Sequence, residues 1–199
     1  FKQKTAYEIM PSLVGSEMCI RDRIQAVQRE ELKVLLDRET ILKRVAEMGQ
    51  EIGEYYADKT NSIVAICVLK GSIHFFSELV LNIPLNVMYS FVHVSSYIGS
   101  SSTGKIRVNS WIDVPVSNEY VLLVEDIVDT GNTIRYIMKY LQRYKPKDIK
   151  LAALIEKKAH DHGINIDFLG FQIEDRFVVG YGLDYDGRFR NLPFVGYKE

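Results

Sequence analysis

Three carboxylates lie at the end of an apolar run, directly before a turn of small hydroxyl-bearing residues. The segment reads VLLVEDIVDTGNTI, with Glu125 and Asp126 after four apolar residues and Asp129 before the turn at 130–133. Carboxylates accept hydrogen bonds from hydroxyls or bind a divalent cation. Successive backbone N–H groups in a turn suit an anion instead. The segment therefore combines groups for hydroxyls with groups for a phosphate.

The segment is predicted to run from a buried strand through a turn into a helix. After the turn, apolar residues recur at helical spacing and Pro146 follows; these are Ile134, Ile137, Met138 and Leu141. Ligands of open parallel sheets bind beyond the carboxyl ends of the strands, where a helix N-terminus adds partial positive charge. Gly131 permits a tight bend, and Thr130 and Thr133 supply hydroxyls. The turn is therefore predicted to hold a phosphate.

The two acids upstream cannot serve that phosphate, because like charges repel. A phosphate beside a diol describes a ribose 5-phosphate, with Asp129 near the anomeric end of the sugar. A Walker-type loop is disfavoured because it needs GxxxxGK[ST] and this turn has no lysine; the dinucleotide motif GxGxxG is absent as well. The remaining alternative is a purely structural acidic strand end.

The elements around this segment predict an α/β fold, with a central, mainly parallel sheet flanked by helices on both faces. A helix after the N-cap Asp37 would bury Ile41, Val45, Met48, Ile52 and Tyr56. A second helix, after the apolar strand SIVAICVLKG, would bury Ile73, Phe76, Leu79 and Val80. NVMYSFVHVSSY and IRVNSWIDV predict a long hairpin, with Trp111 packed inside it. IKLAALIEKK, DFLGFQI and FVVGYG predict three further extended segments.

Composition limits the classes of function. The 199 residues are 47% hydrophobic, enough for one substantial core. Because 25 basic residues face 26 acidic ones, a large nucleic-acid surface is disfavoured. Only Cys19 and Cys67 are present, and no apolar run reaches the roughly 18 residues that span a bilayer. We expect a cytoplasmic protein that binds neither nucleic acid nor membrane.

The first 23 residues show no clean helical or strand period. The run MPSLVGSEMCIRDR is atypical of a folded domain, so residues 1–23 are interpreted as either a non-native segment or a poorly specified extension. Residues 24–199 are predicted to form a single domain.

The chain resembles the 6-oxopurine (hypoxanthine-guanine) branch of the type I phosphoribosyltransferases. VLLVEDIVDTGNT resembles the ribose-phosphate motif of the whole family. Four further segments occur in family order: LKGS at 69–72, SSY at 95–97, LIEKK at 154–158 and RFVVGYGLDYDGRFRN at 176–191. The resemblance covers about residues 32–197. It implies the type I phosphoribosyltransferase fold with a small hood from the C-terminal segment and a mobile hairpin loop, and a homodimer or homotetramer.

The resemblance also implies a reaction and the sites for its sugar phosphate. Family members transfer the 5-phosphoribosyl group from 5-phosphoribosyl 1-pyrophosphate to N9 of hypoxanthine or guanine, with Mg²⁺, and release pyrophosphate. Glu125 and Asp126 would engage the ribose hydroxyls and, with Asp184, the metal. Asp129 would be the general base at purine N7. The 5-phosphate would be bound by Thr130, Gly131, Asn132 and Thr133.

The remaining site residues follow from the same resemblance. Lys70, Gly71 and Arg190 would bind the pyrophosphate, and the peptide bond between Leu69 and Lys70 can be cis. Purine recognition would fall to the 6-oxygen donor Lys157, the stacking ring of Phe177, and the main chain of Val178, with Leu183 near the 2-position. Ser96 and Tyr97 would belong to a loop that closes over the reaction and excludes water.

Some features leave alternatives open. Asn132 stands where some relatives carry lysine, which removes one possible charge from the phosphate site. The HDH run at 160–162 is more typical of a polar loop than of a metal site. A non-catalytic regulator of the same fold, and a phosphoribosyltransferase for adenine or orotate, are the competing functions; Lys157 and the FVVGYGLDY segment disfavour the latter.

Overall fold

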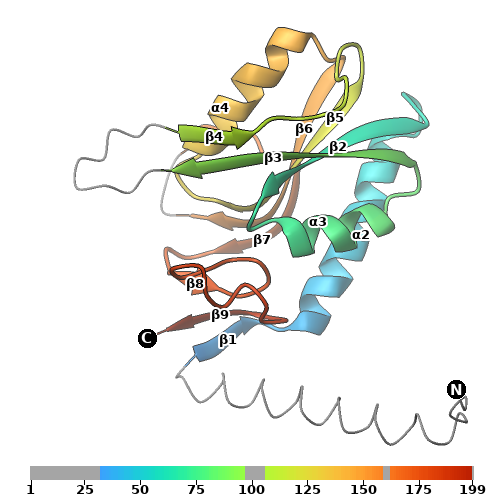
Figure 1. The fold of residues 1–199 in the computed structure, drawn as a ribbon. Helices are drawn as coiled ribbons and strands as arrows, with labels where there is room; N and C mark the ends of the chain where they lie inside the picture. Colours follow the sequence, from blue (N-terminus) through green and yellow to red (C-terminus); the bar gives the residue numbers. More distant parts are fainter. Residues whose placement is uncertain (1–31, 97–105, 159–161, 199) are drawn as a thin grey trace, which may run out of the picture.

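The computed structural model describes residues 32–96, 106–158 and 162–198. Its main sheet contains β2 (Ser62–Leu69), β3 (Asn86–Ser96), β4 (Ile106–Ser110), β5 (Tyr120–Val128), β6 (Asp148–Lys157) and β7 (Phe168–Ile173). The strand order is β4-β3-β2-β5-β6-β7, and every neighbouring pair is parallel except β3 with β4. The predicted α/β fold with a mainly parallel sheet is confirmed (Figure 1).

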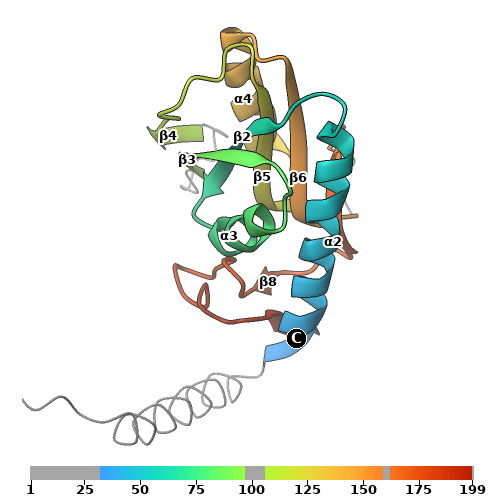
Figure 2. The ribbon, with the colours of Figure 1, turned by 90° about the vertical axis from the view of Figure 1, so that its right-hand side faces the viewer.

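Helices cover both faces of this sheet. They are α2 (Arg38–Tyr56), α3 (Ile73–Leu81) and α4 (Asn132–Leu141), which continues into the 3₁₀ turn η1 (Gln142–Tyr144). One buried apolar cluster includes α2 and α3 side chains, and a second includes those of α4. Figure 2 shows α2 and α4 on opposite sides of the sheet. β5 contributes alternate residues to the two clusters, so it lies at the centre of the fold.

Helix α2 forms as its sequence predicts. Asp37 caps it by accepting a hydrogen bond from the Thr40 amide at 2.7 Å, and this bond lowers the pKa of the Asp37 carboxyl. All five predicted core residues of this helix are fully buried. A Cβ on Gly49 would lie 2.6 Å from Asn82, so α2 passes very close to the end of α3.

In α3 the predicted burial of Ile73 is wrong. Ile73 is 44% exposed, whereas Phe75 is buried together with Phe76, Leu79 and Val80. Ile73 is the first residue of the helix, four residues past the end of β2, so it lies at the end of the buried face. The helical spacing predicts the helix correctly. How many of its residues are buried depends on the neighbouring strand.

The predicted hairpin is confirmed only in part. β3 and β4 pair antiparallel, from His93 opposite Ser110 to Ser96 opposite Ile106. The strand stops before Trp111, and the prediction that Trp111 packs inside the hairpin is wrong. Its ring stacks on Tyr140 of α4 at a centroid distance of 3.4 Å. The residues of the hairpin tip lie outside the described part of the chain.

A second, antiparallel sheet forms the small unit next to the main one. Its order is β1 (Leu32–Leu36), β9 (Val195–Lys198) and β8 (Val178–Val179), below the main sheet in Figure 1. The expected hood therefore also includes an N-terminal strand, which the sequence did not suggest. The extended run after Phe177 ends after two residues because Gly180, Tyr181 and Gly182 all have positive φ angles. None of the described helices is long and apolar enough to span a bilayer.

Candidate active site

Glu125 and Asp126 are buried carboxylates near the carboxyl end of β5. They are only 7% and 8% exposed. Within the described residues, Glu125 Oε2 has no hydrogen-bond partner, whereas Asp126 Oδ1 accepts from the Ile127 amide at 2.9 Å. Burial raises the pKa of both carboxyls, and the neighbouring Asp126 charge raises that of Glu125 further. A hydroxyl donor or a cation would satisfy the oxygen that the protein leaves without a partner.

The loop after β2 lies directly against Asp126. A Cβ on Gly71 would fall 1.6 Å from Asp126 Oδ2, so only glycine fits here. The peptide bond between Leu69 and Lys70 is cis, as the resemblance implies. Gly182 closes in from the small unit, because a Cβ there would lie 1.8 Å from the Gly71 carbonyl oxygen. Three segments that are distant in sequence therefore meet around one carboxylate.

Arg190 joins this cluster through the same glycine. Its Nη1 donates to the Gly182 carbonyl at 2.6 Å, and its Nη2 lies 2.6 Å from Asp184 Oδ1. The Arg190 charge also opposes the rise in the pKa of Asp126 that burial causes. The predicted pyrophosphate contact and the predicted metal ligand thus form an ion pair with each other. No three His, Cys, Asp or Glu side chains cluster as a metal site within the described residues.

The turn between β5 and α4 has the geometry of an anion site. Gly131 takes a left-handed conformation with φ of 71° and, as a glycine, offers no side chain to cap the helix that follows. A Cβ at Gly131 would lie 2.4 Å from Ile164 Cδ1 and 3.2 Å from His162 Cβ, so the 162–164 segment packs against the turn. Thr130 and Asn132 are exposed. Because the first N–H groups of a helix have no partner in that helix, this end suits an anion.

Arg135 fixes the turn from the first turn of α4, a role that the sequence did not suggest. Its Nη2 donates to the Thr130 carbonyl and to Asn132 Oδ1, both at 2.8 Å. Its Nη1 donates to the His162 carbonyl at 2.5 Å. The spacing of three residues between Asn132 and Arg135 was the available signal, since such residues are neighbours on a helix.

Lys157 connects the end of β6 with two carboxylates. Its Nζ lies 3.3 Å from Asp129 Oδ2 and 3.3 Å from Asp175 Oδ1. The Lys157 side chain is 13% exposed, whereas those of Asp129 and Asp175 are 40% and 54% exposed. The predicted general base and the predicted donor to the purine therefore face the same space. Asp175 was not predicted, because only the folded structure brings its carboxylate next to Lys157.

The segment after Asp175 presents an exposed aromatic ring. Phe177 is 59% exposed and meets Tyr185 edge to face, with ring centroids 5.7 Å apart. Val178 is buried in β8 opposite Tyr197, and Leu183 is buried nearby in sequence. The exposed face of Phe177 can stack on a flat base. Of the expected loop residues, Ser96 ends β3 and Tyr97 lies outside the described residues.

The HDH run does not carry a metal cluster in its described part. His162 is buried, and its Nε2 lies 3.1 Å from Glu156 Oε1, while its Nδ1 accepts from the Ile164 amide at 3.2 Å. Both ring nitrogens are thus used within the protein, where they anchor the segment that packs on Gly131. His162 therefore has a structural place behind the turn.

Comparison with known proteins agrees with this geometry. Residues 31–186 match the family model described as a phosphoribosyl transferase domain. The hypoxanthine-guanine-xanthine phosphoribosyltransferase of Tritrichomonas foetus is 37% identical over 168 residues, covering 82% of this chain and 90% of that protein. The hypoxanthine-guanine phosphoribosyltransferase of Bacillus subtilis (strain 168) is 40% identical over 166 residues, covering 82% and 91%.

Solved structures give the same result. A hypoxanthine phosphoribosyltransferase from Staphylococcus aureus superposes with a TM-score of 0.80 at 35% identity, covering 87% of this chain and 95% of that one. A hypoxanthine phosphoribosyl transferase from Trypanosoma cruzi, studied for the role of its C-terminal region in oligomeric state and activity, gives 0.78 at 31% identity, with coverages of 84% and 91%.

Proposed function

This chain belongs to the phosphoribosyl transferase family, and from that membership we propose the reaction of its hypoxanthine-guanine members. The chain is a purine salvage enzyme. It transfers the 5-phosphoribosyl group from 5-phosphoribosyl 1-pyrophosphate to N9 of hypoxanthine or guanine, giving IMP or GMP and pyrophosphate. The observation that supports this proposal most strongly is that Lys157 and Asp129 face one space beside the buried carboxylates of β5.

The sugar phosphate lies along the end of β5 in this proposal. Glu125 and Asp126 accept hydrogen bonds from the ribose hydroxyls, which the unpartnered Glu125 oxygen supports. The 5-phosphate binds the 130–133 turn, mainly through backbone N–H groups. The left-handed Gly131 and the uncapped start of α4 support this placement.

A divalent metal accompanies the substrates, and we propose Mg²⁺. Asp126, Glu125 and Asp184 are the carboxylates that would hold it. They form no cage of three by themselves, and Mg²⁺ normally keeps only one or two carboxylates beside substrate oxygens and water. When bound, the ion would neutralise charge on the pyrophosphate as it leaves.

The pyrophosphate binds on the side of the sugar opposite the 5-phosphate. Lys70 and Gly71 would present the loop after β2, and Arg190 would add a guanidinium. The contact between Gly182 and Gly71 supports this arrangement, because it brings the Arg190 segment against the loop. The Lys70 ammonium and the Arg190 guanidinium stabilise the negative charge that develops as the bond from C1 to the pyrophosphate oxygen breaks.

The purine completes the site. Phe177 stacks on its ring, the Val178 main chain meets its Watson–Crick edge, and Lys157 donates to the 6-oxygen. As N9 forms the bond to C1, Asp129 takes the proton from N7, and the electron pair of the broken bond leaves with the pyrophosphate. Adenine presents an amino group to the Lys157 ammonium, so two donors would face each other and adenine is rejected.

The wider properties of the enzyme follow the family. We propose a single catalytic domain over residues 24–199, a homodimer or homotetramer, and a cytoplasmic location. Ser96 and Tyr97 belong to the loop that closes over the reacting sugar and excludes water.

One spectrophotometric assay tests the proposed function. Hypoxanthine, guanine, xanthine and adenine are each supplied with 5-phosphoribosyl 1-pyrophosphate and Mg²⁺, and nucleotide and pyrophosphate are measured. We expect turnover with hypoxanthine or guanine and none with adenine. Two outcomes would contradict the proposal: turnover with adenine but none of the other bases, or a folded protein that turns over none of the four bases.

A further inference from the structure

The Arg135 guanidinium donates hydrogen bonds to three different oxygen atoms. It donates to the Thr130 carbonyl, to the Asn132 side chain and to the His162 carbonyl. We propose that Arg135 is the positioning residue of the 5-phosphate site, which holds the turn so that its backbone N–H groups face the phosphate. This inference rests on the proposed function, because it concerns the same substrate.

The first contact sets the direction of a phosphate-binding amide. The Thr130 carbonyl and the Gly131 N–H belong to one planar trans peptide, in which they point in opposite directions. Because Arg135 Nη2 holds the Thr130 oxygen at 2.8 Å, the Gly131 N–H is directed away from the Arg135 flank of α4. Gly131 has no Cβ to limit rotation of this peptide and adopts a φ of 71°, so the peptide needs an external anchor.

The second contact keeps the amides of the helix start available. An asparagine at the beginning of a helix can fold back and accept hydrogen bonds from nearby N–H groups. Here the Asn132 Oδ1 accepts from Arg135 Nη2 at 2.8 Å, and the N-cap residue Gly131 has no side chain that could cap α4. Arg135 therefore occupies the oxygen that would otherwise compete with the phosphate.

The third contact ties the turn to a rigid support. The His162 carbonyl accepts from Arg135 Nη1, and the His162 ring contacts Glu156 on β6 at 3.1 Å. Glu156 adjoins Lys157, the proposed donor to the purine. The His162 Cβ and the Ile164 side chain also fill the space beside Gly131. The turn is thus held against the strand that carries the base-binding lysine.

The geometry of these contacts separates arginine from lysine. A guanidinium is a planar fork that can serve three acceptors at fixed angles, whereas an ammonium is a compact charge on a flexible stem. Arg135→Lys keeps the positive charge and loses the fork, and Arg135→Met loses both. Lys139→Met removes the same charge from the last turn of α4, about one helical turn beyond Arg135 and at the opposite end of the helix from the phosphate site.

The experiment measures KM for both substrates, kcat and the melting temperature for these three variants and the wild type. We expect Arg135→Lys to raise KM for 5-phosphoribosyl 1-pyrophosphate about tenfold, as for one well-oriented charged hydrogen bond. KM for hypoxanthine and kcat should stay close to wild type. Arg135→Met should show at least the same loss, and Lys139→Met none. A general folding defect would instead lower kcat at unchanged KM, because it reduces the active fraction.

Calorimetric binding of ribose 5-phosphate to each protein keeps this inference separate from the proposed function. Failure of the wild type to form nucleotide would remove the proposed function, while weaker ribose 5-phosphate binding by Arg135→Lys would still support the role of the turn. An Arg135→Lys enzyme with wild-type KM and wild-type ribose 5-phosphate affinity would overturn the inference. Equal losses in Arg135→Met and Lys139→Met would show that only charge matters, and would overturn it as well.

Discussion

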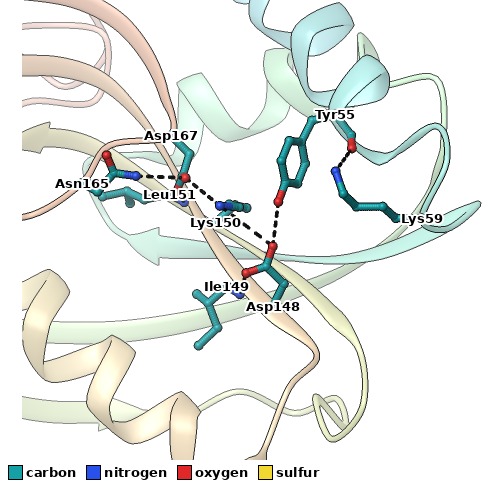
Figure 3. A network of polar contacts seen from close by, with 8 residues as sticks. All are labelled: Tyr55, Lys59, Asp148, Ile149, Lys150, Leu151, Asn165 and Asp167. Atoms are coloured by element: carbon teal, nitrogen blue, oxygen red, sulfur yellow. Dashed lines mark hydrogen bonds and ion pairs between the residues drawn. The ribbon is translucent and has the colours of Figure 1, made fainter.

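The two ends of strand β6 hold their charges in different ways. At its first residues, Lys150 Nζ lies 2.9 Å from Asp167, and the Tyr55 hydroxyl donates to Asp148 at 2.9 Å. Figure 3 shows these side chains in one network, with Asn165 donating to Asp167. At its last residue, Lys157 lies between two carboxylates at the longer distance of 3.3 Å from each.

Two carboxylates beside β6, Asp167 and Glu125, differ in the same sense. Asp167 accepts from Lys150, from Asn165 and from the Leu151 amide, so both of its oxygens have partners. Glu125, on the central strand β5, is more buried than Asp167 and has an oxygen without a partner among the described residues. An unpaired buried polar group costs stability unless a ligand satisfies it. The paired groups at the first end stabilise the fold, and we propose that the unpartnered Glu125 oxygen is kept for the substrate.

The largest effect should follow from removing the proposed general base. Asp129→Asn keeps the size of the side chain but cannot accept the N7 proton, so kcat should fall about 10²- to 10⁴-fold. Binding of 5-phosphoribosyl 1-pyrophosphate, measured by calorimetry, should change far less. The matched control is Asp175→Asn, which removes the other partner of Lys157 and should lower kcat no more than about fivefold. Equal losses of turnover and binding in Asp129→Asn would assign Asp129 to binding.

Removal of the charge at the end of β6 should give the next largest effect. Lys157→Met should lower kcat/KM for hypoxanthine about 10- to 100-fold, the loss expected for a charged hydrogen bond. The ratio of hypoxanthine to adenine turnover should narrow, which the four-base assay measures. Lys158→Met is the control, since Lys158 is 49% exposed and pairs with Glu174. Unchanged selectivity in Lys157→Met would contradict its role in reading the 6-position.

A smaller effect, on stability, should distinguish Glu125 from the paired acids. Burial raises the pKa of Glu125 well above 4.5, so the folded state holds this proton more tightly than the unfolded state. The contribution of Glu125 to wild-type stability should therefore fall as the pH rises above 4.5, and level off above the raised pKa. Glu125→Gln removes this ionisation and should recover stability at pH 8. Each kcal/mol of recovered unfolding free energy should raise the melting temperature by about 2–4 °C. Thermal melts of both proteins from pH 4 to 8 measure the difference, and a lower melting temperature for Glu125→Gln throughout would oppose the account.

The smallest effect is expected at the paired end. Tyr55→Phe removes the hydroxyl that donates to Asp148 and should cost about 1 kcal/mol of stability, or roughly 2–4 °C in melting temperature. The kcat and the KM values for both substrates should stay unchanged, because this end of β6 is opposite the proposed site. A loss of turnover in a folded Tyr55→Phe protein would show that the two ends of β6 are not independent.

The sequence predicted what depends on local pattern. Helical spacing and the N-cap identified α2 correctly, and the apolar runs identified the strands that carry Glu125 and Lys157. These features depend on the intrinsic periods of helix and strand, which a single chain displays directly. Most of the proposed site residues could likewise be named, because motif resemblance marks them.

What the sequence did not predict depends on contacts between distant segments. Arg135 and Asp175 are ordinary exposed charges until the fold brings them to the turn and to Lys157. The exposure of Ile73 and the stacking of Trp111 on α4 depend on where the neighbouring elements end. β1 pairs with β9 from the other end of the described chain, and no local pattern announces such a partner.

The stabilisation of the protein by its substrate shows whether the Glu125 oxygen takes part in substrate binding. The melting temperature is measured for wild type and Glu125→Gln, with and without 5-phosphoribosyl 1-pyrophosphate and Mg²⁺. At a fixed ligand concentration, a ligand that binds the folded state raises this temperature more as its affinity increases. The account predicts that the free Glu125→Gln protein melts higher than free wild type, and that the substrate raises the wild type by the larger increment. Equal increments in the two proteins would contradict the claim that the buried Glu125 oxygen is kept for the substrate.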